Sequence, residues 1–393
     1  MRRIGLFVSV LCVAAFVLGA SQVSAQDVIK FGASYGMTGR IGWIGGDCVD
    51  GAKLIIEETN AKGGIKGKKI ELVVYDSENN PDKARTNFEK LIKKDGVVAI
   101  LGPTVTTESQ TVLPVAEKAK IPFIVVSGGI EVNEKILPEY KKEGKKCYMW
   151  ALSVGTQRQN EAKVAWLKKK GFKSLGNIEP LDQMGDLSAQ TYKEFCQKYG
   201  LKLVAQERFD DKGTDFTTQM SKIKAAGADS IGSMCSGAPA VTLVKNRDQV
   251  GMRDFPFMLS DANISKKFIE LLGENTHNIY SVGAKIEYVS YLKEDDPQKK
   301  VIADFQKRFK AKYGKDPQSW FFAAVGYDSA LMFIKAVEAV GTDGEKIRDW
   351  LEKQDKFQGA QAVYSWSDMD HRGIGLDQCL VVTIKDGRWI PAP

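Results

Sequence analysis

Histidine is scarce in this chain. Of its 393 residues only two are histidines, His277 and His371. Neither stands in an HExxH or HxH spacing or beside a cysteine, and no CxxC pair occurs anywhere. Because zinc and related metals need closely spaced His, Cys and carboxylate ligands, the sequence predicts no metal site and no cofactor.

Signatures of enzymes are also missing. No GxSxG nucleophile elbow is present. The glycine-rich stretch Lys62–Lys69 resembles a phosphate-binding loop only loosely, because its spacing is wrong and no Ser or Thr follows the lysine pair. We interpret it as a helix stop and a turn. Forty-nine acidic residues are present, and no pattern selects a catalytic pair among them. The sequence therefore predicts no catalytic residues and a function other than catalysis.

Massed charge of one sign is absent as well. The formal net charge is +7, but Lys and Arg alternate with Asp and Glu along the chain. The run Lys168–Lys170 ends an amphipathic helix, where cations interact favourably with the helix dipole. This pattern is typical of a solvated surface rather than of a nucleic-acid interface, so no nucleic-acid partner is expected.

The amino-terminal 25 residues have the features of a secretory signal peptide. Met1 to Arg3 is positively charged, Ile4 to Ala20 is apolar, and Val23 to Ala25 places small residues before Gln26. The alternative is a membrane anchor, but the apolar run is about 17 residues, short of the ~20 that span a bilayer. Cys12 follows a leucine inside that run, so we expect no lipid anchor. Segment 1–25 is predicted to be cleaved, which places the mature chain in the periplasm.

The mature chain lacks a second long apolar run and is expected to be soluble. Its five cysteines lie far apart. An oxidising compartment permits one or two disulfides, and the odd number leaves at least one thiol unpaired. The pairing stays open among Cys48, Cys147, Cys196, Cys235 and Cys379.

The remaining residues exceed the ~250–300 that usually share one hydrophobic core, so two lobes are expected. Apolar strand patterns alternate with amphipathic helix patterns throughout. In the first part we expect strands at 28–33, 70–75, 97–101 and 123–126, and helices at 50–61, 81–93 and 108–118. After Trp150 we expect strands at 174–178, 203–209, 230–234, 257–259, 362–365 and 380–384, and helices at 159–170, 189–199, 216–226, 239–250, 298–313 and 321–340. This alternation predicts two doubly wound α/β halves with parallel sheets.

Polar loops follow three of the expected strands. In open α/β sheets ligands lie outside the carboxyl ends of strands, near helix N-termini. The loops are 102–109, 127–131 and 260–263, the last in the second half. Thr104, Thr106 and Ser127 are neutral donors that fit a carboxylate, and Asp261 fits an ammonium group. The combination predicts a zwitterion held between the lobes. Glu131 is either a further acid for a cation or a solvent-facing loop residue.

Several motifs occur in an order that is typical of one family. They are Phe31–Gly39, Asp50–Ala52, Asn60–Gly67, Tyr75–Asp76, Gly102–Pro103, Gly326–Ala330 and Ser365–Trp366. The stretch N-A-K-G-G-I-K-G after an amphipathic helix is the most specific of them. The whole mature chain resembles the periplasmic Leu/Ile/Val-binding protein family, the type I solute-binding proteins of branched-chain amino acid ABC importers.

The resemblance implies two Rossmann-like lobes joined by three crossovers, which close on a ligand like a hinge. The crossovers should fall near 149–154, 281–285 and 358–365. Lobe I would comprise 26–149 and 284–358, and lobe II 150–283 and 359–393. The implied function is capture of an amino acid or related small carboxylate by a monomer that delivers it to the membrane subunits of an ABC permease.

The resemblance also implies ligand-binding residues. In lobe I the carboxylate would meet Thr106, with Thr104 or Val105, and the loop formed by Ser127, Gly128, Gly129, Ile130 and Glu131. In lobe II the ammonium group would meet Asp261. An aromatic position on the cleft wall corresponds to Trp43 or Ile44.

Three departures from the family pattern weaken a specific assignment to leucine. Ile130 or Glu131 stands where the family has threonine, Met184 where it often has an aromatic residue, and Ser236 near a missing tyrosine. The sequence therefore leaves an aromatic acid or a short amide open as the ligand. A sensory protein that presents its ligand to a membrane receptor is the alternative function.

Overall fold

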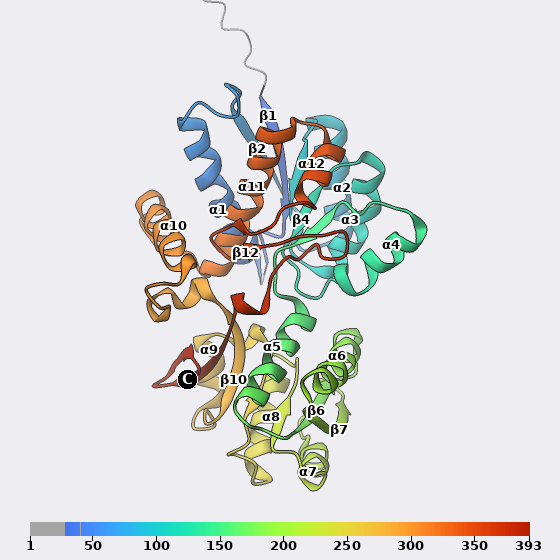
Figure 1. The fold of residues 1–393 in the computed structure, drawn as a ribbon, viewed down its shortest axis with the longest axis vertical. Coiled ribbons are helices and arrows are strands. Elements are labelled where there is room, and N and C mark those ends of the chain that lie inside the picture. The colour runs from blue at the N-terminus through green and yellow to red at the C-terminus, as the bar shows by residue number, and fades with distance from the viewer. Residues whose placement is uncertain (1–27, 40) are drawn as a thin grey trace, which may run out of the picture.

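The computed structural model describes residues 28–39 and 41–393, so the predicted signal peptide lies outside the described residues. The described chain forms two α/β lobes, one above the other in Figure 1. The upper lobe has a five-stranded sheet in the order β2-β1-β3-β4-β5 and the lower lobe a seven-stranded sheet in the order β14-β13-β10-β9-β8-β6-β7. The predicted two-lobe, doubly wound α/β fold is confirmed.

Lobe I has an all-parallel sheet. Its strands are β1 Ile29–Tyr35, β2 Ile70–Asp76, β3 Ala99–Leu101, β4 Phe123–Val125 and β5 Met149–Ala151. Its helices are α1 Gly42–Ala61, α2 Pro81–Lys90, α3 Thr106–Ala119, α4 Leu137–Glu143, α10 Pro297–Tyr313, α11 Trp320–Val340 and α12 Gly344–Leu351. A short hairpin of β11 Phe357–Gln358 and β12 Val363–Tyr364 follows α12.

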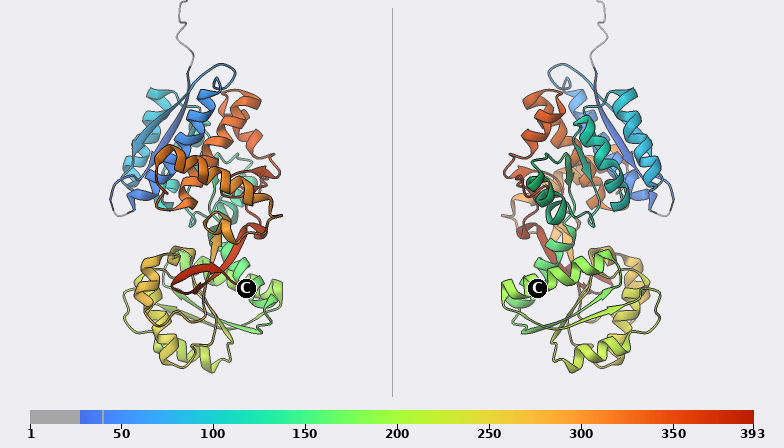
Figure 2. Two further views of the ribbon diagram at one scale, coloured as in Figure 1. Left: turned by 90° about the vertical axis from the view of Figure 1, so that its left-hand side faces the viewer. Right: turned by 90° about the vertical axis from the view of Figure 1, so that its right-hand side faces the viewer.

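Lobe II has a parallel sheet with two antiparallel strands at one edge. Its strands are β6 Ser174–Pro180, β7 Lys202–Phe209, β8 Ser230–Gly232, β9 Phe257–Met258, β10 Ile279–Ala284, β13 Cys379–Lys385 and β14 Arg388–Pro391. Its helices are α5 Gly155–Lys169, α6 Gln183–Tyr199, α7 Thr217–Ala225, α8 Ala238–Gln249 and α9 Lys266–Leu272. The side views in Figure 2 show the carboxyl terminus on this lobe.

Local sequence signals explain many of the element ends. Asn80 accepts hydrogen bonds from the N–H groups of Asp82 and Lys83, so it caps α2 as the Asn-Pro pair predicted. The helix expected over 81–93 ends as α2 at Lys90 and continues as one π-helical turn, Leu91–Asp95. That turn stops at Gly96, whose φ of 69° is left-handed.

The core of lobe I is centred on the packing of α1 against α11. A Cβ atom at Gly51 would lie 1.8 Å from the Ala323 carbonyl oxygen, and one at Gly326 would lie 1.9 Å from the Cys48 carbonyl oxygen. The two helix backbones therefore touch where only glycine fits. Larger side chains at either position would separate the helices.

The sequence was expected to contain no second apolar run long enough to span a membrane, and by length and composition this expectation is wrong. Within the described residues, one helix, α11, is long and apolar enough to cross a bilayer, and 72% of its apolar window is buried inside the protein. Its apolar residues pack against α1 and the sheet of lobe I, so the run reflects a central core helix.

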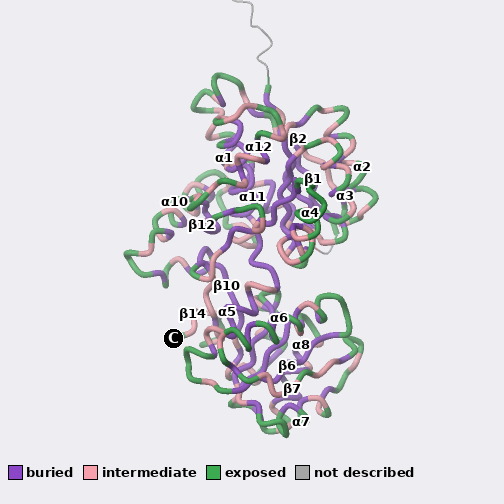
Figure 3. Tube along the Cα trace, turned by 45° about the vertical axis from the view of Figure 1, so that its right-hand side comes forward, coloured by how far each residue is buried: buried purple, intermediate pink, exposed green. Residues whose placement is uncertain are grey.

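The chain passes between the lobes three times, from β5 to α5, from β10 to α10 and from the β11–β12 hairpin to β13. The first two crossings leave the carboxyl ends of β5 and β10, which run parallel to β4 and β9. The carboxyl edges of the two sheets therefore lie on the side where the lobes connect. Figure 3 shows much of the chain at this junction coloured as buried.

The third crossing comes later than the predicted 358–365. Asp328 of α11 accepts hydrogen bonds from the N–H groups of Ala360 and Gln361 and from the Tyr364 hydroxyl. These bonds hold the β11–β12 hairpin on lobe I, and the chain reaches the second sheet only at Cys379. The lobe limits themselves stay predictions.

The described cysteines form no disulfides. Cys48, Cys147, Cys196, Cys235 and Cys379 are all free thiols, and only Cys379 is more than slightly accessible. The disulfides that an oxidising compartment permits are not formed here, because the five side chains are dispersed through separate parts of the two cores.

Candidate ligand-binding site

The loops after β3 and β4 lie side by side at the carboxyl edge of lobe I. The N–H of Gly102 donates to the Ile124 carbonyl oxygen at 2.8 Å, and that of Val126 donates to the Pro103 carbonyl oxygen at 3.1 Å. Gly102 has a φ of 98°, and a Cβ there would lie 2.2 Å from the Ser34 carbonyl oxygen. A glycine is thus needed for the loop to fold back over β1.

Thr106 and Ser127, both predicted ligand residues, are in direct contact. Their hydroxyl oxygens are 2.5 Å apart, and either can donate. Thr106 is the first residue of α3, and a Cβ at Gly129 would lie 3.0 Å from its hydroxyl oxygen. The structure therefore brings Thr106, Ser127 and Gly129 together at one point on the edge of lobe I.

Free backbone donors surround this pair. The N–H groups of Thr106 and Thr107, in the first turn of α3, donate to no acceptor among the described residues. Unpaired N–H groups at a helix N-terminus carry partial positive charge and bind anions. Together with two neutral hydroxyls, they form a surface that favours a carboxylate.

Thr104 and Val105 contribute to this loop in another way. The Thr104 hydroxyl accepts the N–H of Gly36 at 3.0 Å. The carboxylate of Glu108 accepts the N–H groups of Thr104 and Val105 at 3.3 and 3.2 Å. Burial raises the pKa of the Glu108 carboxyl, and these bonds oppose that rise. The two residues therefore shape the loop, with their backbone donors already bonded.

Two side chains of the loop after β4, Ile130 and Glu131, lie in different environments. Ile130 is only 2% exposed and packs in the apolar cluster beneath α3, so its side chain belongs to the core. Glu131 is partly exposed and accepts the side-chain amide of Gln183, at the start of α6 in lobe II, at 3.0 Å. This hydrogen bond joins the carboxyl edges of the two lobes directly.

Asp261 lies at the carboxyl end of β9 in lobe II. Its backbone N–H donates to the Gln159 side chain at 3.2 Å, and the Ser260 hydroxyl donates to its carboxylate at 3.2 Å. The residue is exposed to solvent, yet the surrounding protein displaces enough water to raise the pKa of its carboxyl. The charge of Lys163 opposes this rise.

A buried charged network lies behind Asp261. Lys163 of α5 and Glu179 of β6 are both fully buried. Glu179 accepts hydrogen bonds from Asn177, Ser188 and the N–H of Met234, at 2.6 to 2.9 Å. Burial raises its pKa to about 7 and lowers that of Lys163 to about 8, while each charge favours the ionised form of the other.

The other predicted site residues occupy the same edges. Ser236 is exposed in the loop after β8, and Met184 is 41% exposed in the first turn of α6. Trp43 is half-buried in the first turn of α1, with its ring edge-on to that of Phe322 at 5.4 Å between centroids. Ile44 packs mainly against the core of lobe I. The aromatic pair of Trp43 and Phe322 offers an apolar wall.

The described cavities lie elsewhere. One of them, of about 270 Å³, is in lobe II. It is lined by α5 and by the segments 376–381 and 391–392. The smaller, of about 10 Å³, lies beside the first and third crossings. Neither includes a predicted ligand residue. Among the described residues no group of three metal-ligating side chains occurs.

Sequence reasoning missed several residues of this region. Gln159, Lys163 and Glu179 stand within ordinary helix and strand patterns, and no local signal marks them as buried polar residues. Arg372 was also missed, although it contacts the loop after β4. The sequence Asp-His-Arg-Gly at 370–373 resembles a surface turn, and its burial depends on residues more than 200 positions away.

Comparison with known families and curated proteins gives matches over nearly the whole described chain. Residues 28–388 match the family described as periplasmic binding protein. A leucine-, isoleucine-, valine-, threonine- and alanine-binding protein of Pseudomonas aeruginosa is 24% identical over 351 residues, 89% of this chain and 88% of that protein. A Leu/Ile/Val-binding protein homolog 7 of Brucella suis is 22% identical over 356 residues, 90% of this chain and 87% of that protein.

Solved structures show the same arrangement of lobes. A type 1 periplasmic binding protein from Bordetella pertussis is 26% identical with a TM-score of 0.73, over 93% of this chain and 100% of that chain. The substrate-binding protein LivJ of a branched-chain amino acid transporter from Streptococcus pneumoniae, in complex with isoleucine, is 23% identical. Its TM-score is 0.69, over 93% of this chain and 99% of that chain.

Proposed function

The chain belongs to the periplasmic binding protein family, and from this premise we propose that it captures a small amino acid between its lobes and delivers it to an ABC importer. The family and its relatives are binding proteins of the branched-chain amino acid transport type, not enzymes. The observation that carries the proposal is the difference between the two carboxyl edges. Lobe I presents the Thr106–Ser127 hydroxyl pair with free N–H groups, and lobe II presents Asp261.

These edges fit the two ends of a zwitterion. The ligand carboxylate would accept hydrogen bonds from the two hydroxyls and from the first turn of α3, where charge-assisted bonds are about twice as strong as neutral ones. The ligand ammonium group would donate to Asp261, which must be ionised for this role. Because each end of the ligand contacts a different lobe, both contacts form fully only when the lobes approach each other.

Closure is proposed as a shift between open and closed populations. A ligand that touches both edges favours the closed state by its extra contacts there. If the closed state is about 1% populated without ligand, about 5.5 kcal/mol of differential affinity inverts the ratio. The closed form would then be the species that a membrane permease recognises in the periplasm, with the binding protein acting as a monomer.

The aromatic pair suggests the nature of the ligand side chain. Trp43 and Phe322 are half-buried near the amino ends of α1 and α11. Their exposed faces would contact an apolar group more favourably than a charged one. This observation favours an aliphatic or aromatic amino acid and leaves the aromatic acids as the second candidate class.

A thermal-shift screen tests the proposal. The mature protein is unfolded, dialysed and refolded to remove co-purified ligand, and then titrated with aliphatic amino acids, aromatic acids and short amides. A ligand at 100 times its Kd adds about 2.7 kcal/mol to the free energy of unfolding. A clear shift with an aliphatic amino acid is expected. A shift only with acids that lack an amine would retain the binding function and remove Asp261 as an ammonium partner.

A further inference from the structure

Arg372 is a buried arginine in the third crossing, and it contacts both the first crossing and the loop after β4. Only 5% of its surface is exposed. One terminal nitrogen, Nη1, donates to the carbonyl and hydroxyl oxygens of Ser153 at 2.9 and 3.0 Å. The other, Nη2, donates to the Gly128 carbonyl oxygen at 3.1 Å and to that of Ile130. One planar fork therefore fixes two segments far apart in sequence.

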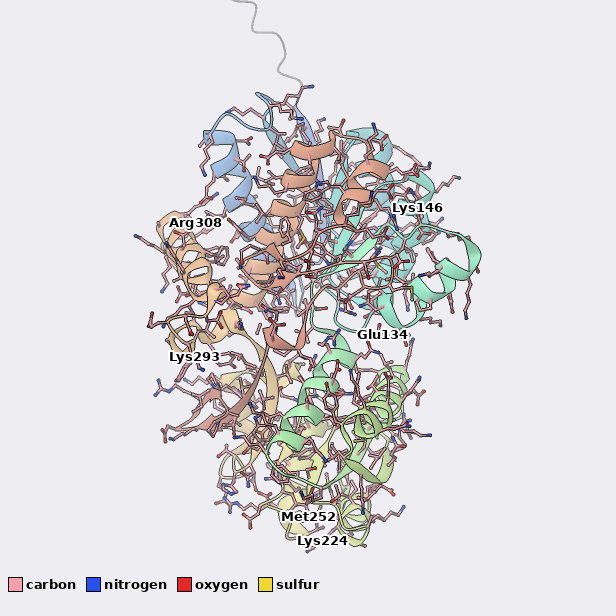
Figure 4. All side chains as sticks on the ribbon, in the orientation of Figure 1. Glu134, Lys146, Lys224, Met252, Lys293 and Arg308 are labelled. Carbon is pink, nitrogen blue, oxygen red and sulfur yellow. The ribbon has the colours of Figure 1, made fainter. Side chains whose placement is uncertain are left out.

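Ser153 extends this contact to a third carbonyl. Its hydroxyl donates to the Ser127 carbonyl oxygen at 2.9 Å while it accepts from Arg372. The carbonyls of Ser127, Gly128 and Ile130 are thus all bonded to the crossings. Glu134, which lines the small cavity beside Arg372, lies at the junction of the lobes in Figure 4.

Peptide geometry turns these contacts into an orientation of the loop. In a planar trans peptide the C=O of one residue and the N–H of the next point in opposite directions. The N–H groups of Gly128, Gly129 and Glu131 must therefore point away from Arg372 and Ser153. None of these three groups donates to an acceptor within the described part of the chain. Gly129 also lies against the Thr106 hydroxyl.

We infer that Arg372 is the positioning residue of the carboxylate-binding loop: it holds the loop carbonyls toward the crossings, so that the N–H groups face the ligand. This inference rests on the proposed function, because it names what orients the same site. It also links the site to the hinge, since Arg372 and Ser153 both belong to segments that connect the lobes. Arg372 itself does not touch the ligand.

The chain offers a matched control in Arg247. This arginine is also buried, with none of its surface exposed, and it donates to the carbonyl oxygens of Phe255, His277 and Asn278. Those residues lie at the amino ends of β9 and β10, the edge opposite the proposed site. Substitution of either arginine removes a buried guanidinium that binds backbone carbonyls. Only the Arg372 guanidinium binds the loop after β4.

The test compares the variants Arg372→Met, Arg372→Lys and Arg247→Met with the unaltered protein. Without ligand, NMR relaxation of glycine-labelled protein gives the backbone order parameters of Gly128 and Gly129. Rigid backbone has a value of about 0.85 and flexible backbone less than about 0.6. We expect the order parameters to fall to the flexible range in both Arg372 variants and to stay high in Arg247→Met. Arg372→Lys, which keeps the charge but not the fork, serves if the methionine variant does not fold.

Calorimetric affinities for L-isoleucine and L-isoleucinamide complete the test. We expect Arg372→Met to weaken isoleucine binding about tenfold or more, because oriented donors to a charged group are lost. Binding of the amide, which lacks the carboxylate, should change much less. The inference is overturned if the loop stays rigid, or if both ligands weaken equally, as they would after general destabilisation.

Failure of the proposed function gives a different result. If neither probe binds the unaltered protein, the amino acid proposal fails, and the order parameters alone decide whether Arg372 positions the loop. A rigid loop in the Arg372 variants would then reject the inference, and a loop that is mobile in them but not in Arg247→Met would support it.

Discussion

The carboxyl edges of the two lobes differ in how they carry charge. Lobe I offers hydroxyls, helix N–H groups and a loop oriented by Arg372, none of which titrates near neutral pH. Lobe II offers Asp261 with Lys163 and Glu179 behind it, and all three have shifted pKa values. One edge is a fixed dipolar surface and the other is an ionisable one. The affinity for a zwitterion should therefore depend on pH through lobe II.

The largest expected effect comes from Asp261→Ala. The change removes the proposed partner of the ligand ammonium group, and loss of one member of such a charge pair costs about 2.7 kcal/mol or more, roughly 100-fold in Kd. Isothermal titration calorimetry with the amino acid identified by the screen measures the loss. Asp254→Ala is the matched control, because Asp254 is an exposed acid in the loop before β9, at the opposite edge of the sheet.

An unchanged Kd in Asp261→Ala would show that the ionisable group at the carboxyl edge of lobe II does not contribute to ligand binding. The ligand would then be held by lobe I alone or by the aromatic pair of Trp43 and Phe322. An equal loss in Asp254→Ala would show that the effect comes from the net charge of lobe II and not from a contact.

An intermediate effect is expected from Lys163→Met. Asp261 must be ionised to bind an ammonium group, so affinity should fall as the pH drops through its pKa. Lys163 favours the ionised form of Asp261, so in Lys163→Met the affinity should begin to decline at a higher pH. On the acid side of that decline, binding weakens about tenfold for each unit by which the pKa has moved. Glu179→Gln removes the charge that favours the ionised form of Lys163, so it should move the decline in affinity in the same direction as Lys163→Met and by less. Kd values from pH 5 to 9 measure both shifts.

The interpretation of this experiment requires that other titrating groups and changes in stability be considered. Cys379 is also electrostatically coupled to Asp261, but burial raises its pKa to about 12, so it stays neutral over this range. The thermal unfolding of each variant must be followed at every pH, since Lys163 and Glu179 are buried and their loss changes stability. Shifts in opposite directions for the two variants would contradict an electrostatic role for this pair.

The sequence predicted the alternation of strands and helices because local signals determine it. The apolar runs of β2 and β3 and the Asn-Pro start of α2 are visible without the fold. The contact between Thr106 and Ser127 was also foreseeable, since both follow parallel strands and carboxyl ends share one edge. The helix α12 was missed, although Asp343 caps it and could have marked its start.

Long-range contacts could not be read in this way. The third crossing was misplaced because Asp328 holds the β11–β12 hairpin from a helix more than 30 residues earlier. The same acid was noted within a family motif, but its anchoring role depends on where the hairpin folds. Burial of Lys163 and Glu179 likewise depends on four elements meeting beneath one edge. Their residue types alone would place them at the surface.

The smallest expected effect concerns the bond that joins the two edges. Glu131 accepts the Gln183 amide at 3.0 Å, and both side chains reach solvent. An exposed hydrogen bond contributes about 0.5–1 kcal/mol, so Glu131→Ala should change Kd about two- to fivefold.

The direction of the change in Kd distinguishes two roles of this bond. If the bond stabilises the open state, its loss should tighten ligand binding. If it stabilises the closed state, its loss should weaken binding. Gln183→Ala should reproduce the Glu131→Ala result, and small-angle X-ray scattering without ligand should show which state each variant favours. Opposite effects of the two variants would mean that Glu131 acts on the ligand itself, as a second acid on the neutral edge, and the contrast between the lobes would then be incomplete.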